Sequence, residues 1–125
     1  MPLLKLYTLP MPDPIQPPAV LTALAAAIAP ILNVKPCQVI AMHIALQPGG
    51  YTKGEVAADW HGSDSHPPVL ELCAFVGRSD AQIELALTAA AHTLTAQLGL
   101  DQGNAFVYHT ELQRGRVFTG GAVRK

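Results

Sequence analysis

The second half of the sequence aligns with the first at an offset of 66 residues, without a gap. Pro2 falls on Pro68, His43 falls on His109, and apolar positions follow in the same register. Two glycine pairs also coincide, Gly49 with Gly115 and Gly54 with Gly120. One coincidence means little in a chain that is 50% hydrophobic, but a common register of proline, histidine and glycine is hard to obtain by chance. Each half is therefore expected to fold as the same supersecondary unit.

Each half has the pattern of a strand, a helix and a second strand. Apolar runs predict opening strands over 3–8 and 69–76 and closing strands over 39–46 and 105–112. Helices are expected over about 18–32 and 80–98. In the second helix, Ile83, Leu87, Leu94 and Leu98 fall on one face, as in an amphipathic helix.

Residues typical of helix ends flank both predicted helices. Ser79 and Gln82 have the spacing of a capping box, and Gly99 follows the end of the second helix. In the first helix, Pro30 should kink or end the helix, because proline has no amide hydrogen.

A strand–helix–strand unit implies two parallel strands joined by a right-handed crossover. Two such units predict an α/β (α+β) fold, with a four-stranded sheet and both helices on one face. We expect a single domain over 1–125, with repeats at 2–58 and 68–125. The segment between them, 59–67, is rich in turn-forming residues and is predicted to be the linker.

Charge and composition narrow the class of partner and the location. The net charge of −1 and the pI near 6.5 give no general attraction to nucleic acids or anionic membranes. The longest apolar run, 19–32, is too short to span a membrane and contains a proline. The first residues do not resemble a signal peptide. We therefore expect a soluble cytoplasmic protein that binds neither nucleic acid nor membrane.

Other residues that often carry chemistry have ordinary structural explanations here. Cys37 and Cys73 lie in or beside apolar strand-like runs, which favours buried free thiols in a reducing compartment. His43 and His109 hold equivalent strand positions, and a structural role is favoured for both. Four possible metal ligands lie in the linker, but a flexible segment offers no fixed geometry, so no metal site is predicted. They are Asp59, His61, Asp64 and His66.

The second half carries motifs of a known family. The segment 68–72, PVLEL, and the segment 77–82, GRSDAQ, resemble the opening of 4-oxalocrotonate tautomerase subunits, in which a proline begins a strand and a Gly-Arg-Ser/Thr turn opens the helix. The tail from Thr110 to Gly121 resembles the last strand and terminal hairpin of that family. Together with Pro2 and the repeat, the resemblance covers nearly the whole chain. Its length resembles the fused, trimer-forming branch, which includes 5-carboxymethyl-2-hydroxymuconate isomerase, malonate semialdehyde decarboxylase and cis-3-chloroacrylic acid dehalogenase.

The resemblance implies chemistry at Pro2 that needs no cofactor. Removal of Met1 would leave Pro2 with a secondary amine at the chain start. A terminal amino group has a pKa near 7.7–8.0, and burial or a nearby cation lowers that pKa. A neutral amine can then move a proton next to a carbonyl group. Arginine binds the substrate carboxylate and stabilises the developing enolate.

The repeat divides these groups between the two halves. Pro68 is internal and has no ionisable amine, so only Pro2 can act as a base. Arg78 falls on Pro12, so only the second half offers that arginine. We therefore assign Pro2 as the general acid/base and Arg78 as the carboxylate binder. Arg116, Glu111 and Phe118 of the tail are further candidates for substrate binding.

Three functions remain open from the sequence. The leading hypothesis is an isomerase for enol–keto tautomerisation of a small 2-oxo or 2-hydroxy unsaturated acid. The second is a catalytically silent, oligomeric ligand-binding or interaction module of the same fold. The third is a related decarboxylase or hydratase. In each case the large apolar fraction and the uncovered sheet face predict a homo-oligomer, and the resemblance implies a homotrimer.

Overall fold

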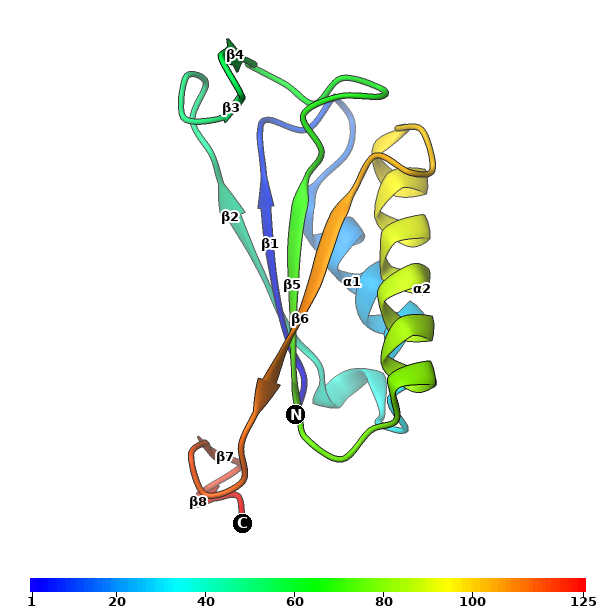
Figure 1. Ribbon diagram of the computed structural model, residues 1–125, viewed down its shortest axis with the longest axis vertical. Helices are drawn as coiled ribbons and strands as arrows, with labels where there is room; N and C mark the ends of the chain where they lie inside the picture. Colours follow the sequence, from blue (N-terminus) through cyan, green and yellow to red (C-terminus); the bar gives the residue numbers. More distant parts are fainter.

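The computed structural model describes all 125 residues. One four-stranded sheet, in the order β2-β1-β5-β6, has both helices on the same face (Figure 1). The predicted fold of two β-α-β units with the helices on one face is confirmed. The strands are β1 (Leu3–Thr8), β2 (Ile40–Ala45), β5 (Val69–Phe75) and β6 (Phe106–Leu112), and the helices are α1 (Pro17–Ile28) and α2 (Asp80–Leu98).

The strand register follows the 66-residue offset of the sequence. β1 pairs parallel with β2, with Leu3 opposite Ile40, and β5 pairs parallel with β6, with Val69 opposite Phe106. β1 and β5 are antiparallel, so the halves are related by an approximate two-fold axis. Lys5 lies opposite its own counterpart, Glu71, and the two form an ion pair of 3.5 Å across this axis. The starts of β1 and β5 therefore lie at opposite ends of the sheet.

A short hairpin follows the closing strand of each half. Strands β3 (Thr52–Lys53) and β4 (Val56–Ala57) form one hairpin, and β7 (Phe118–Thr119) and β8 (Ala122–Val123) form the other. The two hairpins occupy corresponding positions in the repeat, and they lie at opposite ends of the molecule (Figure 1). The β7–β8 hairpin is at the end where the N-terminus lies, whereas β3–β4 is at the start of β5.

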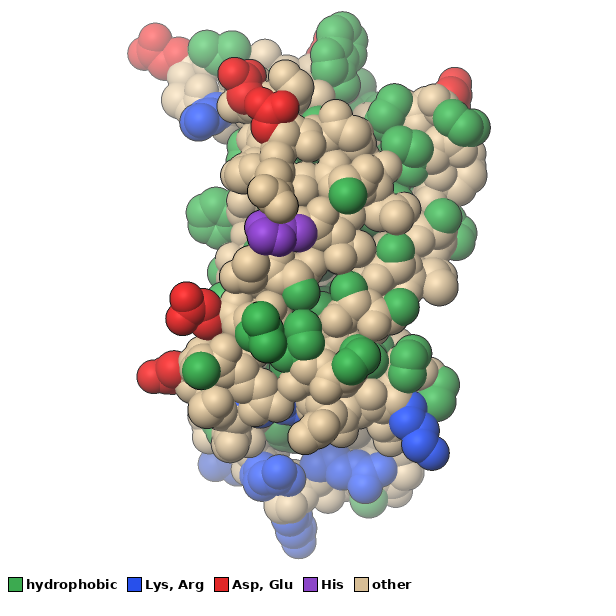
Figure 2. Space-filling model, turned by 90° about the vertical axis from the view of Figure 1, so that its right-hand side faces the viewer, with side chains coloured by type: hydrophobic (Ala, Val, Ile, Leu, Met, Phe, Trp, Pro, Cys, Tyr) green, Lys and Arg blue, Asp and Glu red, His purple; other side chains and the backbone are tan.

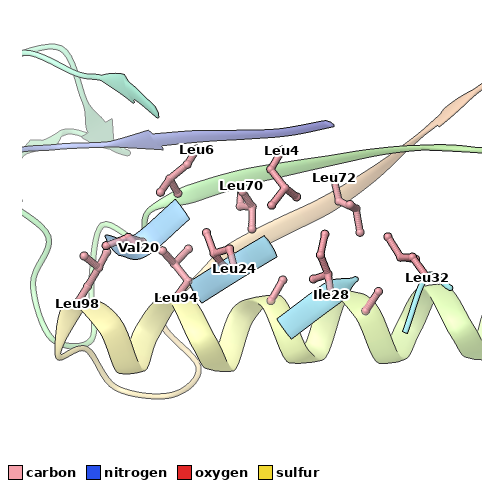
Figure 3. Close-up of a cluster of buried hydrophobic side chains, with 12 residues drawn as sticks. Leu4, Leu6, Val20, Leu24, Ile28, Leu32, Leu70, Leu72, Leu94 and Leu98 are labelled. Carbon is pink, nitrogen blue, oxygen red and sulfur yellow. The ribbon is translucent and has the colours of Figure 1, made fainter. Parts of the chain in front are cut away.

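The core lies between the sheet and the two helices, and both halves contribute to it (Figure 3). Alternate residues of β1 and β5 point toward the helices, since successive side chains of a strand face opposite sides of the sheet. These residues and their partners on α1 and α2 are nearly inaccessible to solvent. They include Leu4, Leu6, Leu70 and Leu72 from the strands and Leu24, Ile28 and Leu94 from the helices.

The helix ends differ in detail from the prediction. α1 ends at Ile28, before Pro30, and a turn carries the chain onward. At the start of α2, the Ser79 hydroxyl accepts a hydrogen bond from the Gln82 amide at 3.2 Å, which is half of the expected capping box. The Gln82 side chain instead donates to the carbonyl oxygen of Ile31 at 2.7 Å, which ties α2 to the end of α1. Gly99 ends α2 with φ of 69°, as expected.

The prediction that both thiols are buried is wrong for one of them. Cys73 is buried on β5, but Cys37 is exposed. The apolar run that was expected to bury Cys37 begins later, at Ile40, and Cys37 lies in the short helix η1 (Pro36–Gln38) that precedes β2. No buried residue belongs to that helix.

The face of the sheet that points away from the helices is uncovered in the single chain. Its outer strands expose Ile40, Met42, Phe106 and Tyr108, with exposed fractions between 38% and 56%. The Lys5–Glu71 ion pair lies at the centre of this face. Neither α1 nor α2 has the length and apolar character that a helix needs to cross a membrane.

Candidate active site

Pro2 lies at the start of β1 and is buried. Its carbonyl oxygen accepts a hydrogen bond from the Ile40 amide at 3.0 Å, which continues the pairing with β2. The counterpart Pro68 is also buried and accepts from the Phe106 amide at 2.9 Å. The two prolines thus have the same backbone role. In this chain Met1 precedes Pro2, so the nitrogen of Pro2 is part of a peptide bond.

The β7–β8 hairpin of the second half reaches the N-terminus of the first. The Thr119 hydroxyl donates to the sulfur atom of Met1 at 3.4 Å. Arg78 approaches the same end from the turn between β5 and α2, because β5 runs antiparallel to β1 and finishes beside the start of β1. The second half therefore reaches the chain start, and Arg78 lies at the same end of the sheet as Pro2.

Burial and two arginines act on the terminal amine. Partial burial lowers the pKa of the Met1 amino group, and the positive charges of Arg124 and then Arg78 lower that pKa further. Both causes favour the neutral amine, because burial and neighbouring cations each penalise the charged form. Arg124 and Arg78 are thus close enough to the chain start to change its acid–base chemistry.

Arg78 is held by backbone carbonyl groups. One terminal nitrogen, Nη1, donates to the Phe75 oxygen at 3.2 Å, and the other, Nη2, donates to the Leu32 oxygen at 2.9 Å. Burial lowers the pKa of Arg78, and the nearby Arg114 lowers it further. A guanidinium group has five N–H donors, so two bonds leave three for another ligand. The side chain is anchored and keeps the capacity to bind a carboxylate.

Arg124 folds back over the turn of its own hairpin. Its Nε donates to the Thr119 oxygen at 2.9 Å and its Nη2 donates to the Gly120 oxygen at 3.3 Å. Gly120 has φ of 63°, and a Cβ atom there would collide with the Arg124 guanidinium group. The sequence interpretation missed Arg124. A signal was available in the repeat, because the counterpart of Arg124 is Ala58, so this arginine, like Arg78, belongs to one half alone.

The other predicted substrate-binding residues are less closely tied to Pro2. Arg116 is exposed, and the only hydrogen bond of its side chain is to the adjacent Gly115 oxygen, at 3.5 Å. Phe118 is 72% exposed on the hairpin. Glu111 is exposed on β6 opposite Ala74, so β5 separates it from β1. Two strand spacings amount to roughly 10 Å, which is too far for Glu111 to position a water molecule directly at Pro2.

The two equivalent histidines lie on the edge strands. On β2, the Nε2 atom of His43 and the Thr8 hydroxyl are 2.7 Å apart. Burial lowers the pKa of His43, which favours its neutral form. His109 occupies the equivalent position on β6, opposite Leu72. The bond between His43 and Thr8 joins β2 to the end of β1 and takes no part in the arrangement around Pro2.

The cationic side chains gather at the end of the sheet where Pro2 lies. In Figure 2, which faces the helices, blue side chains crowd the lower end, and most acidic side chains in view lie above them. Arg114 joins this group, with its Cζ atom 5.6 Å from the centre of the Phe75 ring. An anionic ligand would therefore be attracted to this end in preference to the other.

No protein-family model matches the sequence, and no curated protein matches it. Several solved structures match the fold. Native fused 4-OT has a TM-score of 0.84 at 18% identity, over 97% of this chain and 94% of that chain. A member of the cis-3-chloroacrylic acid dehalogenase family has a TM-score of 0.78 at 16% identity, over 98% and 83%. Malonate semialdehyde decarboxylase inhibited by 3-bromopropiolate has a TM-score of 0.74 at 17% identity, over 94% and 88%.

These structures cover nearly the whole chain in both β-α-β units. The similarity is one of backbone arrangement, because few residues are identical. The fold implied by the resemblance is therefore confirmed, and the chain has the fold that is shared by these tautomerase-superfamily structures.

Proposed function

We propose that the protein is an isomerase that interconverts the enol and keto forms of a small 2-oxo or 2-hydroxy unsaturated acid. Pro2, freed by removal of Met1, is the general acid/base. The observation that carries the proposal is the convergence of Arg124 and Arg78 on the chain start, where burial and then their charges lower the pKa of the Met1 amino group. The same causes are expected to act on the Pro2 amine once Met1 is removed.

The proposed reaction needs few groups. The neutral Pro2 nitrogen accepts the enol hydroxyl proton, the enolate electrons form the ketone, and the protonated amine returns a proton to carbon. Arg78 binds the substrate carboxylate through its remaining N–H donors, and Arg124 stabilises the negative charge on the enolate oxygen. Arg116 and Phe118 of the hairpin are proposed to contact the far end of the substrate.

We also propose that the protein assembles as a homotrimer through the open face of the sheet. The exposed apolar residues of β2 and β6 on that face support this, because monomeric proteins seldom leave such a surface in contact with water. Wild-type fused 4-OT forms symmetric and asymmetric trimers. A particle mass of three chains in sedimentation equilibrium is expected, and conversion to monomer on Met42→Lys together with Phe106→Lys tests the surface.

A catalytically silent module is the second candidate, and it applies if Met1 is retained. With Met1 attached, the Pro2 nitrogen is an amide and has no basic lone pair. If Met1 stays in place in the native organism, the same arginine-rich end would bind an anion without turning it over. Intact mass of the native protein separates the two functions.

A decarboxylase or hydratase is the third candidate, because malonate semialdehyde decarboxylase shares the fold. Such chemistry needs a carboxylate beside the amine to direct water. Glu111 is the acidic candidate of the tail, and its place across β5 from β1 argues against that role.

The test compares the two prolines of the repeat. Intact mass must first show that Pro2 is the first residue of the protein. That protein is expected to catalyse the tautomerisation of enol phenylpyruvate, with a rate that saturates as the substrate concentration rises. Pro2→Ala should lower kcat/KM by about 10²-fold or more, the usual contribution of a positioned acid/base. Pro68→Ala is the matched control, since it alters the same strand position without removing an ionisable nitrogen. Absence of turnover in the processed wild type would refute the proposal.

A further inference from the structure

A hollow of about 590 Å³ lies at the end of the sheet opposite Pro2. Its lining comes from the loop after β1, the loop after β2, the linker and the end of α2. Its volume falls within the range of small-molecule pockets, about 300–1,000 Å³. The lining includes the acidic residues Asp13 and Asp59, the ring of Trp60 and the apolar side chains of Met11, Leu98 and Leu100.

The hollow occupies the place in the first half that the Arg78 turn fills in the second. Pro12 stands at the position of Arg78, and the lining residue Leu98 stands at the position of Leu32. At the Pro2 end, the Arg78 guanidinium spans this gap and bonds the Leu32 carbonyl oxygen. Pro12 has no such group, so the corresponding space remains open. The difference between the two turns explains why the hollow exists.

The charge of the hollow is opposite to that of the Pro2 end. Asp13 and Asp59 line it, and no lysine or arginine does. His61 adds no positive charge, because both ring nitrogens are engaged: Nε2 accepts from the Leu9 amide at 2.9 Å, and Nδ1 bonds the His66 carbonyl oxygen. Burial lowers the pKa of His61, which favours the same neutral form.

The rest of the lining is apolar and aromatic. Trp60, the only tryptophan of the chain, is 69% exposed, and Met11, Leu98 and Leu100 are apolar neighbours. The face of an aromatic ring attracts cations, and the indole ring of tryptophan does so more strongly than the other aromatic side chains. Carboxylates beside an aromatic ring and an apolar floor suit a ligand with a positive head and an apolar body.

We propose that this hollow is a binding site for a small organic cation, an ammonium group carried on an aryl or alkyl body. The ammonium group lies between the carboxylates of Asp13 and Asp59 and the indole of Trp60, and the apolar body rests on Met11, Leu98 and Leu100. A metal ion fits less well, because both nitrogens of His61 are engaged in hydrogen bonds. Asp13 and Asp59 would then be the only side-chain ligands, and both are exposed to solvent. The site is independent of the chemistry proposed at Pro2.

Trp60 provides a direct measurement. Titration with 2-phenylethylammonium, which is cationic at neutral pH, is expected to change the Trp60 fluorescence in a saturable way. 2-Phenylethanol and 3-phenylpropionate have the same aryl body without the positive charge, and they should bind at least about five-fold more weakly. The affinity of the cation should fall with added salt, since exposed ionic contacts are screened.

The carboxylates supply the matched variants. Asp13→Asn and Asp59→Asn should each weaken binding of the cation about five-fold, in keeping with partly exposed charge contacts. Asp64 lies in the same linker as Asp59 but does not line the hollow. The Asp64→Asn variant should therefore bind the cation with the affinity of the wild type. Equal binding of 2-phenylethanol, equal loss in Asp64→Asn, or no saturable change below about 10 mM would each overturn the proposal. Phenylpyruvate turnover, measured in parallel, should not change in any of the three variants.

Discussion

At one end of the sheet the chain places Arg78, Arg114 and Arg124, whereas the counterparts at the other end are Pro12, Pro48 and Ala58. The final residue, Lys125, has Asp59 as its counterpart. The backbone pairing is nevertheless the same at both ends, with each proline bonding the first residue of the neighbouring strand at 3.0 and 2.9 Å. The duplicated framework thus presents one cationic end and one acidic end, so the two ends suit ligands of opposite charge.

This comparison separates what the repeat keeps from what it changes. The core positions stay apolar and buried in both halves, since they hold the sheet against the helices, although Val20 and Leu24 have the smaller counterparts Ala86 and Ala90. The turns and hairpins, which lie at the surface, are free to differ, as loops usually are. Four measurements test this division between a shared core and differing ends. Each compares two variants, either at corresponding positions of the repeat or at two residues that affect the same group or have similar burial.

The largest effect is expected in the core. Leu6→Ala and Leu72→Ala truncate corresponding side chains that are 0% and 1% exposed. Each should lower the free energy of unfolding by about 2–5 kcal/mol, because a cavity replaces a buried leucine. The two losses should agree within about 1 kcal/mol if the halves carry equal shares of the core.

Urea denaturation at one fixed protein concentration measures both losses, since an oligomer's apparent stability depends on concentration. A difference above about 2 kcal/mol would contradict the equivalence of the two halves. It would also show that one β-α-β unit holds the other in place.

The next effect compares the hairpin glycines Gly120 and Gly54. Their φ angles are 63° and 59°, so Gly120→Ala and Gly54→Ala should each cost about 1–2 kcal/mol for the left-handed backbone. Only the Cβ at Gly120 would meet another side chain, the Arg124 guanidinium group. Gly120→Ala should therefore also displace Arg124 and raise the pKa of the terminal amine.

Thermal unfolding gives the stability of each glycine variant, and NMR titration of the first residue gives the pKa of the amine. Gly54→Ala controls for the backbone cost, since nothing lies within 4 Å of the Cβ position there. An unchanged amine pKa in Gly120→Ala would mean that the Arg124 position does not depend on this glycine.

A third comparison ranks the cations at the Pro2 end. Arg124→Gln and Arg78→Gln each remove a charge that lowers the pKa of the terminal amine, so each should raise that pKa. The shift should be larger for Arg124, which has the stronger effect of the two. If the proposed chemistry holds, the acidic limb of the pH–rate profile moves to higher pH in the same order.

Arg116→Gln is the control for the third comparison. The Arg116 side chain is exposed and bonds only the Gly115 oxygen, and it is not among the charges that lower the pKa of the terminal amine, so its removal should leave that pKa unchanged. A shift for Arg116→Gln as large as that for Arg124→Gln would mean that overall charge, and not position, sets the pKa.

The fold could be predicted from the sequence because the repeat constrains it twice. Apolar residues in strand and helix patterns recur 66 residues apart, so the elements and their order follow from either half. The antiparallel pairing of β1 with β5, centred on Lys5 and Glu71, was not predictable in this way. The direction of this pairing depends on contacts between the two halves. The apolar pattern within each half would be the same if β1 and β5 were parallel.

The site was predictable in part. The repeat identified Pro2 and Arg78 as complementary, and the structure places both at one end of the sheet. The repeat shows that Arg124 belongs to one half alone, but it does not show that Arg124 lies at the chain start, because that position depends on a glycine turn and two backbone carbonyl oxygens. The hollow at the other end was equally hidden, because it results from the absence of a long side chain at position 12, where Pro12 stands in place of an arginine. A sequence pattern shows which residues are present, but it does not show where cavities lie between them in the folded chain.

The smallest effect concerns the acidic end and its histidine. The Leu9 amide donates to His61 Nε2 at 2.9 Å, and this bond requires the unprotonated nitrogen. Burial lowers the pKa of His61 below its ordinary value of 6.5, so the unfolded chain takes up this proton at a higher pH than the folded chain does. Stability from this group is therefore present above pH 6.5 and is lost as the pH falls through the folded pKa.

Hydrogen exchange at the Leu9 amide detects this loss locally. Its protection factor, which corrects for the intrinsic pH dependence of exchange, should decrease as the pH falls below 6.5. In His61→Gln the decrease should disappear. In His43→Gln it should persist, because His43 is also half-buried but bonds the Thr8 hydroxyl and not the Leu9 amide. If the decrease persists in His61→Gln, another group at this end of the sheet titrates. The conclusion that His61 is neutral and adds no positive charge to the hollow would then lose its support.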